Sequence, residues 1–223
     1  MRLIKLIALY FKIYLSIIFL ILVIIHAMLR NYNQIFAIND DTETFSFSAF
    51  QERVGESVGS ALSSCNKRNK KPIIICIGSD LVLGDSLGPL VGTMLVRRTA
   101  PAYIYGTLGS PITAKEVACA KTQLKLFHPE SFAIAVDAAV GNADDIGLIK
   151  VTNRGLKPGL GVDKNLGVLG DCSIIGVVAE KSAQNYNLFN LTRLNLIYKM
   201  AEKIADGVEK FLISYFNENK TTA

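Results

Sequence analysis

Residues 72–89 read PIIICIGSDLVLGDSLGP, and the rest of the chain can be interpreted from this stretch. Ile73 to Ile77 is a short β-branched run, which is typical of a buried strand. A glycine-bounded loop follows. Ser86 to Arg98 then has helical spacing, with Asp85 as a plausible N-cap and Pro89 in the first turn. The stretch therefore predicts a strand, a loop and a helix, in that order.

The alternation of strand-like and helix-like runs continues to residue 216. Thr113 and Glu116 resemble a capping box near the start of the next helix. Strands that alternate with helices form largely parallel sheets covered on both faces, so residues 72–216 predict a three-layer α/β/α sandwich with a mostly parallel sheet. The further predicted strands are Ala102–Thr107, Phe132–Val136, Ile146–Thr152 and Ser173–Ala179. The further predicted helices are Ile112–Phe127 and Asn187–Phe216, the second of them interrupted at Gly207.

Two aspartates, Asp85 and Asp137, each lie just past one of these strand-like runs. Ligands of such sheets bind beyond the carboxyl ends of strands, where the strand order reverses. If the strands ending at Ile77 and Val136 are neighbours, the two carboxylates face one pocket. Two acids in one pocket raise the pKa of one of them, so one stays protonated while the other activates water. The pair could equally hold a metal ion.

Purely structural roles for the acidic residues remain open at this point. Asp85 could simply cap its helix, and Asp137 could accept hydrogen bonds from loop amides. Asp80 could be a turn residue. Asp163 and Asp171 belong to a glycine-rich loop over residues 153–171 that could approach the site.

Several other kinds of chemistry are disfavoured. The residue after Gly84 is acidic rather than lysine, so the loop does not match a phosphate-binding P-loop. A serine triad is disfavoured because no G-x-S-x-G elbow is present. The histidines are His26 and His128, and neither is well placed as a catalytic base or as a ligand of a transition metal. No C-x-x-C pair occurs, and Cys76 and Cys172 are predicted to be small buried hydrophobes rather than ligands or bridges.

The N-terminal segment predicts a membrane anchor. Residues 13–29 are almost entirely apolar and, with Leu6 to Phe11, reach the roughly 20 residues that a membrane span needs. A cleaved signal peptide is the rival interpretation. The predicted layout is an anchor or signal-anchor at 1–30, a linker with a possible short helix at 31–71, the α/β domain at 72–216 and a tail at 217–223. The side of the membrane that holds the domain stays open.

The net charge of +5 does not indicate a nucleic-acid partner. Four of the 24 basic residues lie within the first 35 residues, where there is no acidic residue. The remainder has 20 basic and 19 acidic residues and is nearly neutral. A nucleic-acid-binding domain normally has a strong basic excess, so none is expected here.

Several motifs resemble those of the YyaC-type sporulation proteins, which are regarded as spore proteases. That family is similar to the spore germination protease, which degrades small acid-soluble spore proteins, and both resemble the hydrogenase-maturation endopeptidases in fold. The matching motifs are GSD at 78–80, GDSLGPLVG at 84–92, GTL at 106–108, VDA at 136–138, PGLGV at 158–162, GDCSIIGVV at 170–178 and TRL at 192–194.

The resemblance implies a sporulation-associated peptidase of the hydrogenase-maturation-peptidase fold. Asp85 and Asp137 match the two aspartates that the germination protease is thought to use. The pocket around them is expected to include Gly78, Ser79, Asp80, Thr107 and Gly159. The expected partners are protein or peptide substrates, small acid-soluble spore proteins among them, and the membrane through the N-terminal helix.

Two alternatives to that function stay open. Hydrogenase-maturation peptidases add a metal-binding histidine from a later loop, but residues 153–171 contain none. No cofactor is therefore expected, and a metal-assisted maturation peptidase with a divalent metal on Asp85 and Asp137 is one alternative. The other is a non-catalytic peptide-binding or scaffold protein of the sporulating cell.

Overall fold

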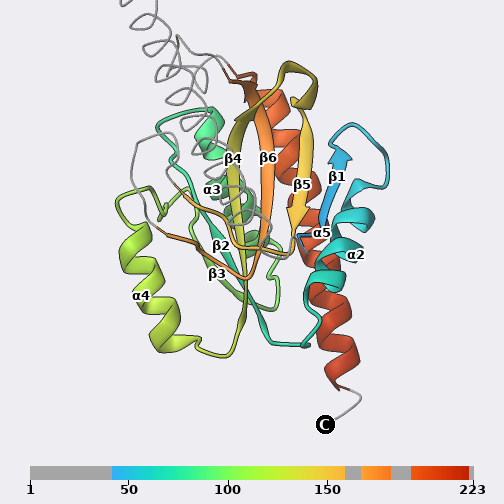
Figure 1. The fold of residues 1–223 in the computed structure, drawn as a ribbon, viewed down its shortest axis with the longest axis vertical. Coiled ribbons are helices and arrows are strands. Elements are labelled where there is room, and N and C mark those ends of the chain that lie inside the picture. The colour runs from blue at the N-terminus through green and yellow to red at the C-terminus, as the bar shows by residue number, and fades with distance from the viewer. Residues whose placement is uncertain (1–41, 159–166, 182–191, 221–223) are drawn as a thin grey trace, which may run out of the picture. The chain divides into compact units, whose positions relative to one another are not determined.

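The computed structural model describes residues 42–158, 167–181 and 192–220. Within them, six strands form one mixed sheet in the order β1-β5-β6-β4-β2-β3 (Figure 1). The strands are β1 (Thr44–Ser48), β2 (Pro72–Cys76), β3 (Tyr103–Tyr105), β4 (Phe132–Gly141), β5 (Leu148–Thr152) and β6 (Cys172–Glu180). The helices are α2 (Val54–Cys65), α3 (Leu87–Arg97), α4 (Val117–Phe127) and α5 (Leu194–Lys220), with 3-10 turns η1 (Gly84–Ser86) and η2 (Ala143–Asp145).

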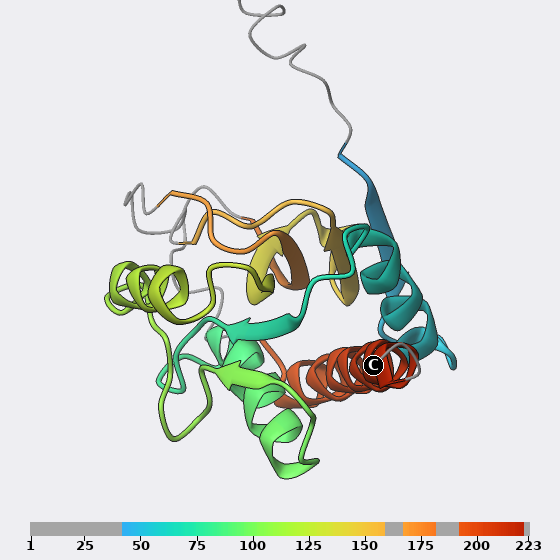
Figure 2. The same ribbon diagram turned by 90° about the horizontal axis from the view of Figure 1, so that it is seen from below.

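The sheet is mostly parallel, as predicted. β3, β2, β4 and β6 run parallel to one another, whereas β5 and β1 are added antiparallel beyond β6. α2, α3 and α5 share one core cluster with one face of the sheet. α4 packs on the other face with residues of two loops. Figure 2 shows α3 and α5 on one side of the sheet and α4 on the opposite side.

α5 is one continuous helix, although Gly207 predicted an interruption. Gly207 instead permits close packing against α2. A Cβ there would lie 2.5 Å from a methyl carbon of Val58 and 2.9 Å from the Gly55 carbonyl oxygen. The helix pair therefore needs a residue without a side chain at this contact.

The segment before Pro72, predicted as a linker with a possible short helix, contains the strand β1 and the helix α2. β1 pairs antiparallel with β5, with Thr44 opposite Thr152, and α2 packs against α5. Both belong to a compact unit that begins at Thr42. β1 is hard to recognise because its short TFSFS sequence has only half-buried and exposed side chains. Half-buried edge strands carry a weak hydrophobic pattern.

The predicted membrane anchor over residues 1–30 lies outside the described residues. Among the residues that are described, no helix combines the length and apolar character needed to span a bilayer.

Candidate functional site

The site is built where the strand order reverses. β2 lies between β3 and β4, and the connecting helices α3 and α4 cover opposite faces of the sheet. Cys76 is opposite Val136, and the Ile77 N–H donates a hydrogen bond to the Val136 carbonyl at 2.8 Å. The prediction that these two strands are neighbours is therefore confirmed. Ligands of open α/β sheets bind at such a reversal point.

The glycines of the first loop bring Asp85 against the end of β2. Gly78 has φ +138°, and a Cβ there would lie 2.0 Å from the Asp85 carbonyl oxygen. The Ser79 N–H donates to that same carbonyl at 3.2 Å. A Cβ on Gly88 would lie 2.0 Å from the Ile77 carbonyl oxygen. The first turn of α3 thus sits directly on the strand end, and this accounts for the glycine spacing of the motif.

Asp85 does not cap α3, so the helix-capping role considered for it is wrong. The N-cap position is Ser86, and no side chain makes a capping hydrogen bond there. The Ser86 hydroxyl donates instead to the Leu83 carbonyl at 2.6 Å. Burial raises the pKa of the half-buried Asp85 carboxyl, and the Ser79 amide partly offsets that rise. A half-buried aspartate with a raised pKa is a candidate functional group.

Asp137 lies in β4, one residue beyond the last pair with β2. Its carboxylate accepts a hydrogen bond from the Ala138 N–H at 2.8 Å. Burial, followed by the negative charge of Asp85, raises the pKa of Asp137 to about 8, and the Ala138 amide opposes this. The two acids are therefore close enough for one to bias the ionisation of the other. Near neutral pH, the pair is expected to hold one proton.

The protonation of Asp137 predicts that folding stability falls as pH rises between about 4 and about 8. Its pKa is about 8 in the folded chain and near 3.8 when unperturbed, so unfolding releases a proton throughout this window. The contribution is at most about 1.4 kcal/mol per pH unit. Urea unfolding of the native chain and of Asp137→Asn, measured across the window, should give profiles that diverge with pH. If the free energies of unfolding of the two proteins changed with pH in parallel, the raised pKa of Asp137 would be contradicted.

The other predicted pocket residues occupy loops at the same edge of the sheet. Gly78, Ser79 and Asp80 follow β2, with Gly78 buried and Asp80 exposed. The Ser79 hydroxyl accepts a hydrogen bond from the Leu81 N–H at 3.2 Å. Thr107 follows β3, where its hydroxyl accepts from the Ser110 N–H at 3.2 Å. Gly159 lies outside the described residues.

Asp171 does not approach the aspartate pair. It precedes β6, and its carboxylate accepts a hydrogen bond from the Ala133 N–H at 2.9 Å, at the start of β4. Because β4 and β6 run parallel, residues that precede them lie at the amino edge, opposite Asp137. His128 is also held elsewhere, since its Nε2 is 2.6 Å from the Tyr105 hydroxyl. Asp163 lies outside the described residues.

Two features near the pair have no signal in the sequence. The Ala138 amide that binds the Asp137 carboxylate is a backbone group, which no side-chain pattern predicts. β4 also continues to Gly141, well past the predicted end at Val136. Two hollows on the described part of the surface lie between β1 and α2 and beside the end of α2, and neither is lined by Asp85 or Asp137. The acid pair is therefore identified by its charge coupling and position.

The comparisons with known proteins agree with the motifs. Residues 47–207 match the family described as "Protein of unknown function (DUF1256)". The chain is also similar to "Uncharacterized protein YyaC" of Bacillus subtilis (strain 168), with 39% identity over 148 residues. That alignment covers 66% of this chain and 72% of YyaC. The chain therefore belongs to the YyaC-type family, DUF1256.

Proposed function

We propose that the chain is a peptidase that hydrolyses protein substrates with Asp85 and Asp137. The observation that carries this proposal is the coupling of the two acids at the switch point of the sheet. Burial and the Asp85 charge raise the pKa of Asp137 to about 8, so the pair can present one acid and one base near neutral pH.

In the proposed mechanism the two carboxyls divide the proton transfers. The ionised acid, assigned to Asp85, takes a proton from water as the water oxygen attacks the carbonyl carbon of the scissile bond. The protonated acid, assigned to Asp137, donates to the leaving amine as the carbon–nitrogen bond breaks. Asp85 then carries the proton that Asp137 has lost, and one proton exchange restores the pair. General acid–base groups of this kind contribute about 10²- to 10⁴-fold each.

The part of β4 beyond its pairing with β2 supports a peptide as the substrate. Pairing with β2 ends at Val136, whereas pairing with β6 continues to Gly141. The Val136 carbonyl faces β2, and main-chain groups alternate along a strand, so those of Ala138 and Val140 face the same side. The Ala138 N–H already donates to the Asp137 carboxylate, which leaves the Ala138 carbonyl and the Val140 groups for a peptide. No strand among the described residues pairs with that side of β4 beyond Val136. An extended peptide could add there as a strand, with its backbone beside Asp137.

The substrate class follows from the family resemblance. YyaC-type proteins resemble the germination protease, so small acid-soluble spore proteins are the first substrates to test. The full-length chain is incubated with such a protein and, as a matched control, with an unrelated unfolded protein of similar length. New termini in the spore protein, identified by mass spectrometry, support the peptidase. Stable binding without new termini would favour the non-catalytic peptide-binding alternative.

Chelation separates this mechanism from a metal-assisted one. Within the described parts of the chain, no three His, Cys, Asp or Glu side chains are grouped as a metal site. Stable zinc sites in proteins usually have three or four protein ligands. Cleavage is therefore expected to change by less than about twofold after EDTA treatment. A larger loss that added zinc or manganese reverses would instead assign a metal to Asp85 and Asp137.

A further inference from the structure

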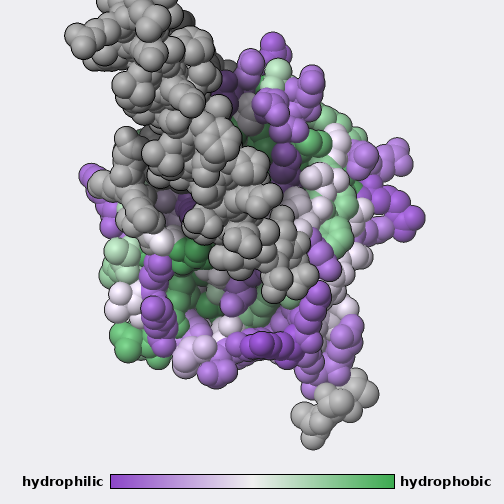
Figure 3. Space-filling model, in the orientation of Figure 1, coloured by the Kyte–Doolittle hydropathy of each residue, from purple (hydrophilic) through white to green (hydrophobic). Residues whose placement is uncertain are grey.

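The amino edge of the sheet, opposite the aspartate pair, carries a basic connection. This connection, residues 66–71, joins α2 to β2 and reads NKRNKK, with Lys67, Arg68 and Lys71 exposed. It lies directly beside the start of β4, because the Phe132 N–H donates to the Lys71 carbonyl at 2.8 Å. Figure 3 shows a hydrophilic band along the lower rim of this face, where the basic connection runs.

The basic connection has a fixed backbone. The Asn66 side chain donates to the Lys70 carbonyl at 2.8 Å and accepts from the Lys70 N–H at 3.0 Å. The Asn69 side chain donates to Asn219 of α5 at 2.9 Å, and the Tyr215 hydroxyl donates to the Asn69 carbonyl at 3.4 Å. The positive charges therefore project from a preformed loop, so less conformational entropy is lost when they bind an anionic partner.

Acidic groups near the basic connection do not cancel its charge. Glu43 pairs with Lys67 at 3.5 Å, and Asp171 accepts a backbone hydrogen bond from β4 at 2.9 Å. Glu130 is exposed in the connection from α4 to β4. A hollow of about 200 Å³ opens beside the basic connection, and its charged lining residues are Lys67, Arg68, Lys70 and Asp171. Three cations thus face one carboxylate there, and that carboxylate already has a partner.

Exposed apolar side chains lie next to these charges. The Lys71 ammonium is 5.6 Å from the centre of the Tyr103 ring, and that ring packs on His128 with their centres 4.8 Å apart. The last two residues of α4, Leu126 and Phe127, directly precede His128 and are 69% and 71% exposed. Figure 3 shows hydrophobic residues near the lower end of α4, beside the hydrophilic band. Basic side chains beside Tyr, Phe and Leu are typical of surfaces that contact the membrane interface.

The chain also enters the folded unit at this edge. The compact unit begins at Thr42, and β1 starts at the amino edge because β1 and β6 both run antiparallel to β5. Eleven residues, 31–41, separate Thr42 from the membrane anchor predicted for residues 1–30. Fully extended, they reach about 40 Å at most. A bilayer that holds the predicted anchor is therefore always within a short tether of the basic connection, which favours binding of the second contact.

We propose that the amino edge of the sheet docks on the anionic headgroups of a lipid bilayer. The basic connection binds the headgroups, and Leu126 and Phe127 enter the interface beside it. Anionic lipids attract clustered Lys and Arg residues, and this attraction acts only within about 10 Å of the membrane surface. The docked surface turns the carboxyl edge, with Asp85 and Asp137, away from the bilayer and towards protein substrates. The docking itself does not rest on the peptidase activity.

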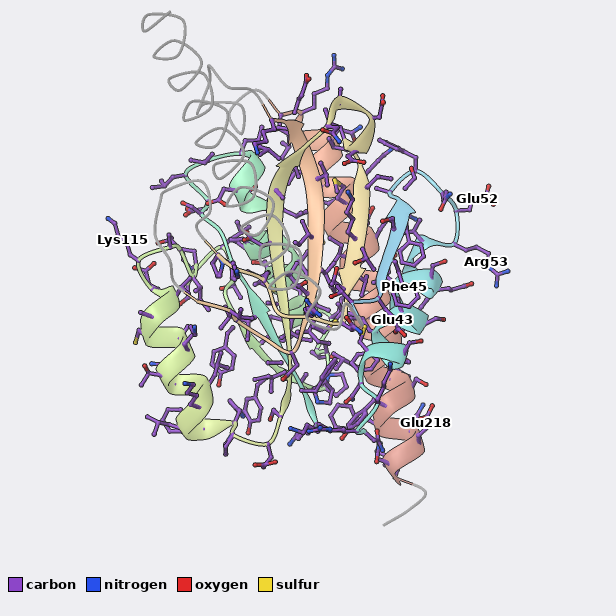
Figure 4. The ribbon with its side chains drawn as sticks, in the orientation of Figure 1. Glu43, Phe45, Glu52, Arg53, Lys115 and Glu218 are labelled. Carbon is purple, nitrogen blue, oxygen red and sulfur yellow. The ribbon has the colours of Figure 1, made fainter. Side chains whose placement is uncertain are left out.

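The test acetylates the lysine amines of the full-length chain on lipid vesicles. The vesicles are phosphatidylcholine alone or with about one-third phosphatidylglycerol, and mass spectrometry reads each lysine. On the anionic vesicles, acetylation of Lys67 and Lys71 should fall several-fold relative to Lys115 and Lys181, and added salt should reverse this. Both reference lysines are exposed at the carboxyl edge, since Lys115 precedes α4 and Lys181 follows β6. Figure 4 shows Lys115 at the upper end of α4, away from the lower rim.

A charge variant tests the basic connection directly. Arg68→Gln combined with Lys70→Gln removes two charges, which should weaken the attraction about tenfold or more and restore most of the acetylation of Lys71. Lys115→Gln combined with Lys181→Gln removes the same charge from the other edge and should leave Lys71 protected.

Three results would overturn the proposal. The first is equal acetylation of Lys71 on the two kinds of vesicle. The second is protection that persists when Arg68 and Lys70 are replaced. The third is protection of Lys71 by poly-glutamate but not by anionic vesicles, which would assign the surface to an acidic protein instead. None of these results depends on peptide cleavage, so the proposal can fail while the peptidase stands, and the reverse.

Discussion

Asp85→Asn and Asp137→Asn are each expected to lower the rate of peptide cleavage by about 10³-fold. Asparagine keeps nearly the same shape but can neither accept the proton of water nor deliver one to the leaving amine. The two acids act as one unit, so the double variant should be little slower than either single variant. The rates are measured as kcat and KM on a substrate that the native chain cleaves. The loss should appear in kcat.

Asp144→Asn is the matched control for these variants. Asp144 is an exposed aspartate in η2, just past the end of β4, and its replacement should leave the rate within about twofold. Folding is checked by urea unfolding, where Asp137→Asn should not be less stable at high pH, because it removes a buried charge. If cleavage survives at the native rate in both variants, the aspartate mechanism is wrong even though the family assignment stands.

The central part of the fold could be predicted because its signals are local. The apolar run of β2, the glycine loop and the helical spacing of α3 all lie within one stretch, and α3 begins within one residue of the predicted start. The capping box was predicted from Thr113 and Glu116, and the Thr113 N–H does donate to the Glu116 carboxylate at 3.1 Å. α4 nevertheless begins at Val117, because Ile112 bridges to Ile77 instead of joining the helix.

The parts that could not be predicted depend on contacts between distant segments. The end of β4 is strand because Ala138 lies opposite Gly176 of β6, and an Ala-Ala-Val-Gly sequence carries no strand pattern of its own. Asp171, which the sequence allowed to approach the site, lies at the opposite edge for a related reason. It precedes β6, and β6 runs parallel to β4, but the sequence predicted only a mostly parallel sheet and not the order of these two strands.

Gly106→Ala is expected to destabilise the chain by about 3–5 kcal/mol, a large part of the roughly 5–15 kcal/mol that holds a typical domain together. Gly106 has φ +84°, which strains any residue with a side chain, and it directly follows β3. Its Cβ would lie 1.8 Å from the Cys76 carbonyl oxygen. Cys76 is fully buried and paired with β4, so the strand cannot shift without breaking the sheet next to Asp137.

Gly109→Ala is the matched control for this substitution, because it lies in the same loop and a Cβ there would meet nothing within 4 Å. Its free energy of unfolding should stay within about 0.5 kcal/mol of the native value. Urea unfolding measures the free energy of unfolding of both variants. The midpoints can be compared only if this free energy falls with urea concentration at the same slope in each protein. If the urea midpoint of Gly106→Ala equals that of the native chain, β2 must be able to move away from the loop. The acid pair would then not be fixed by the backbone contacts at the strand end, and its coupling would need another source.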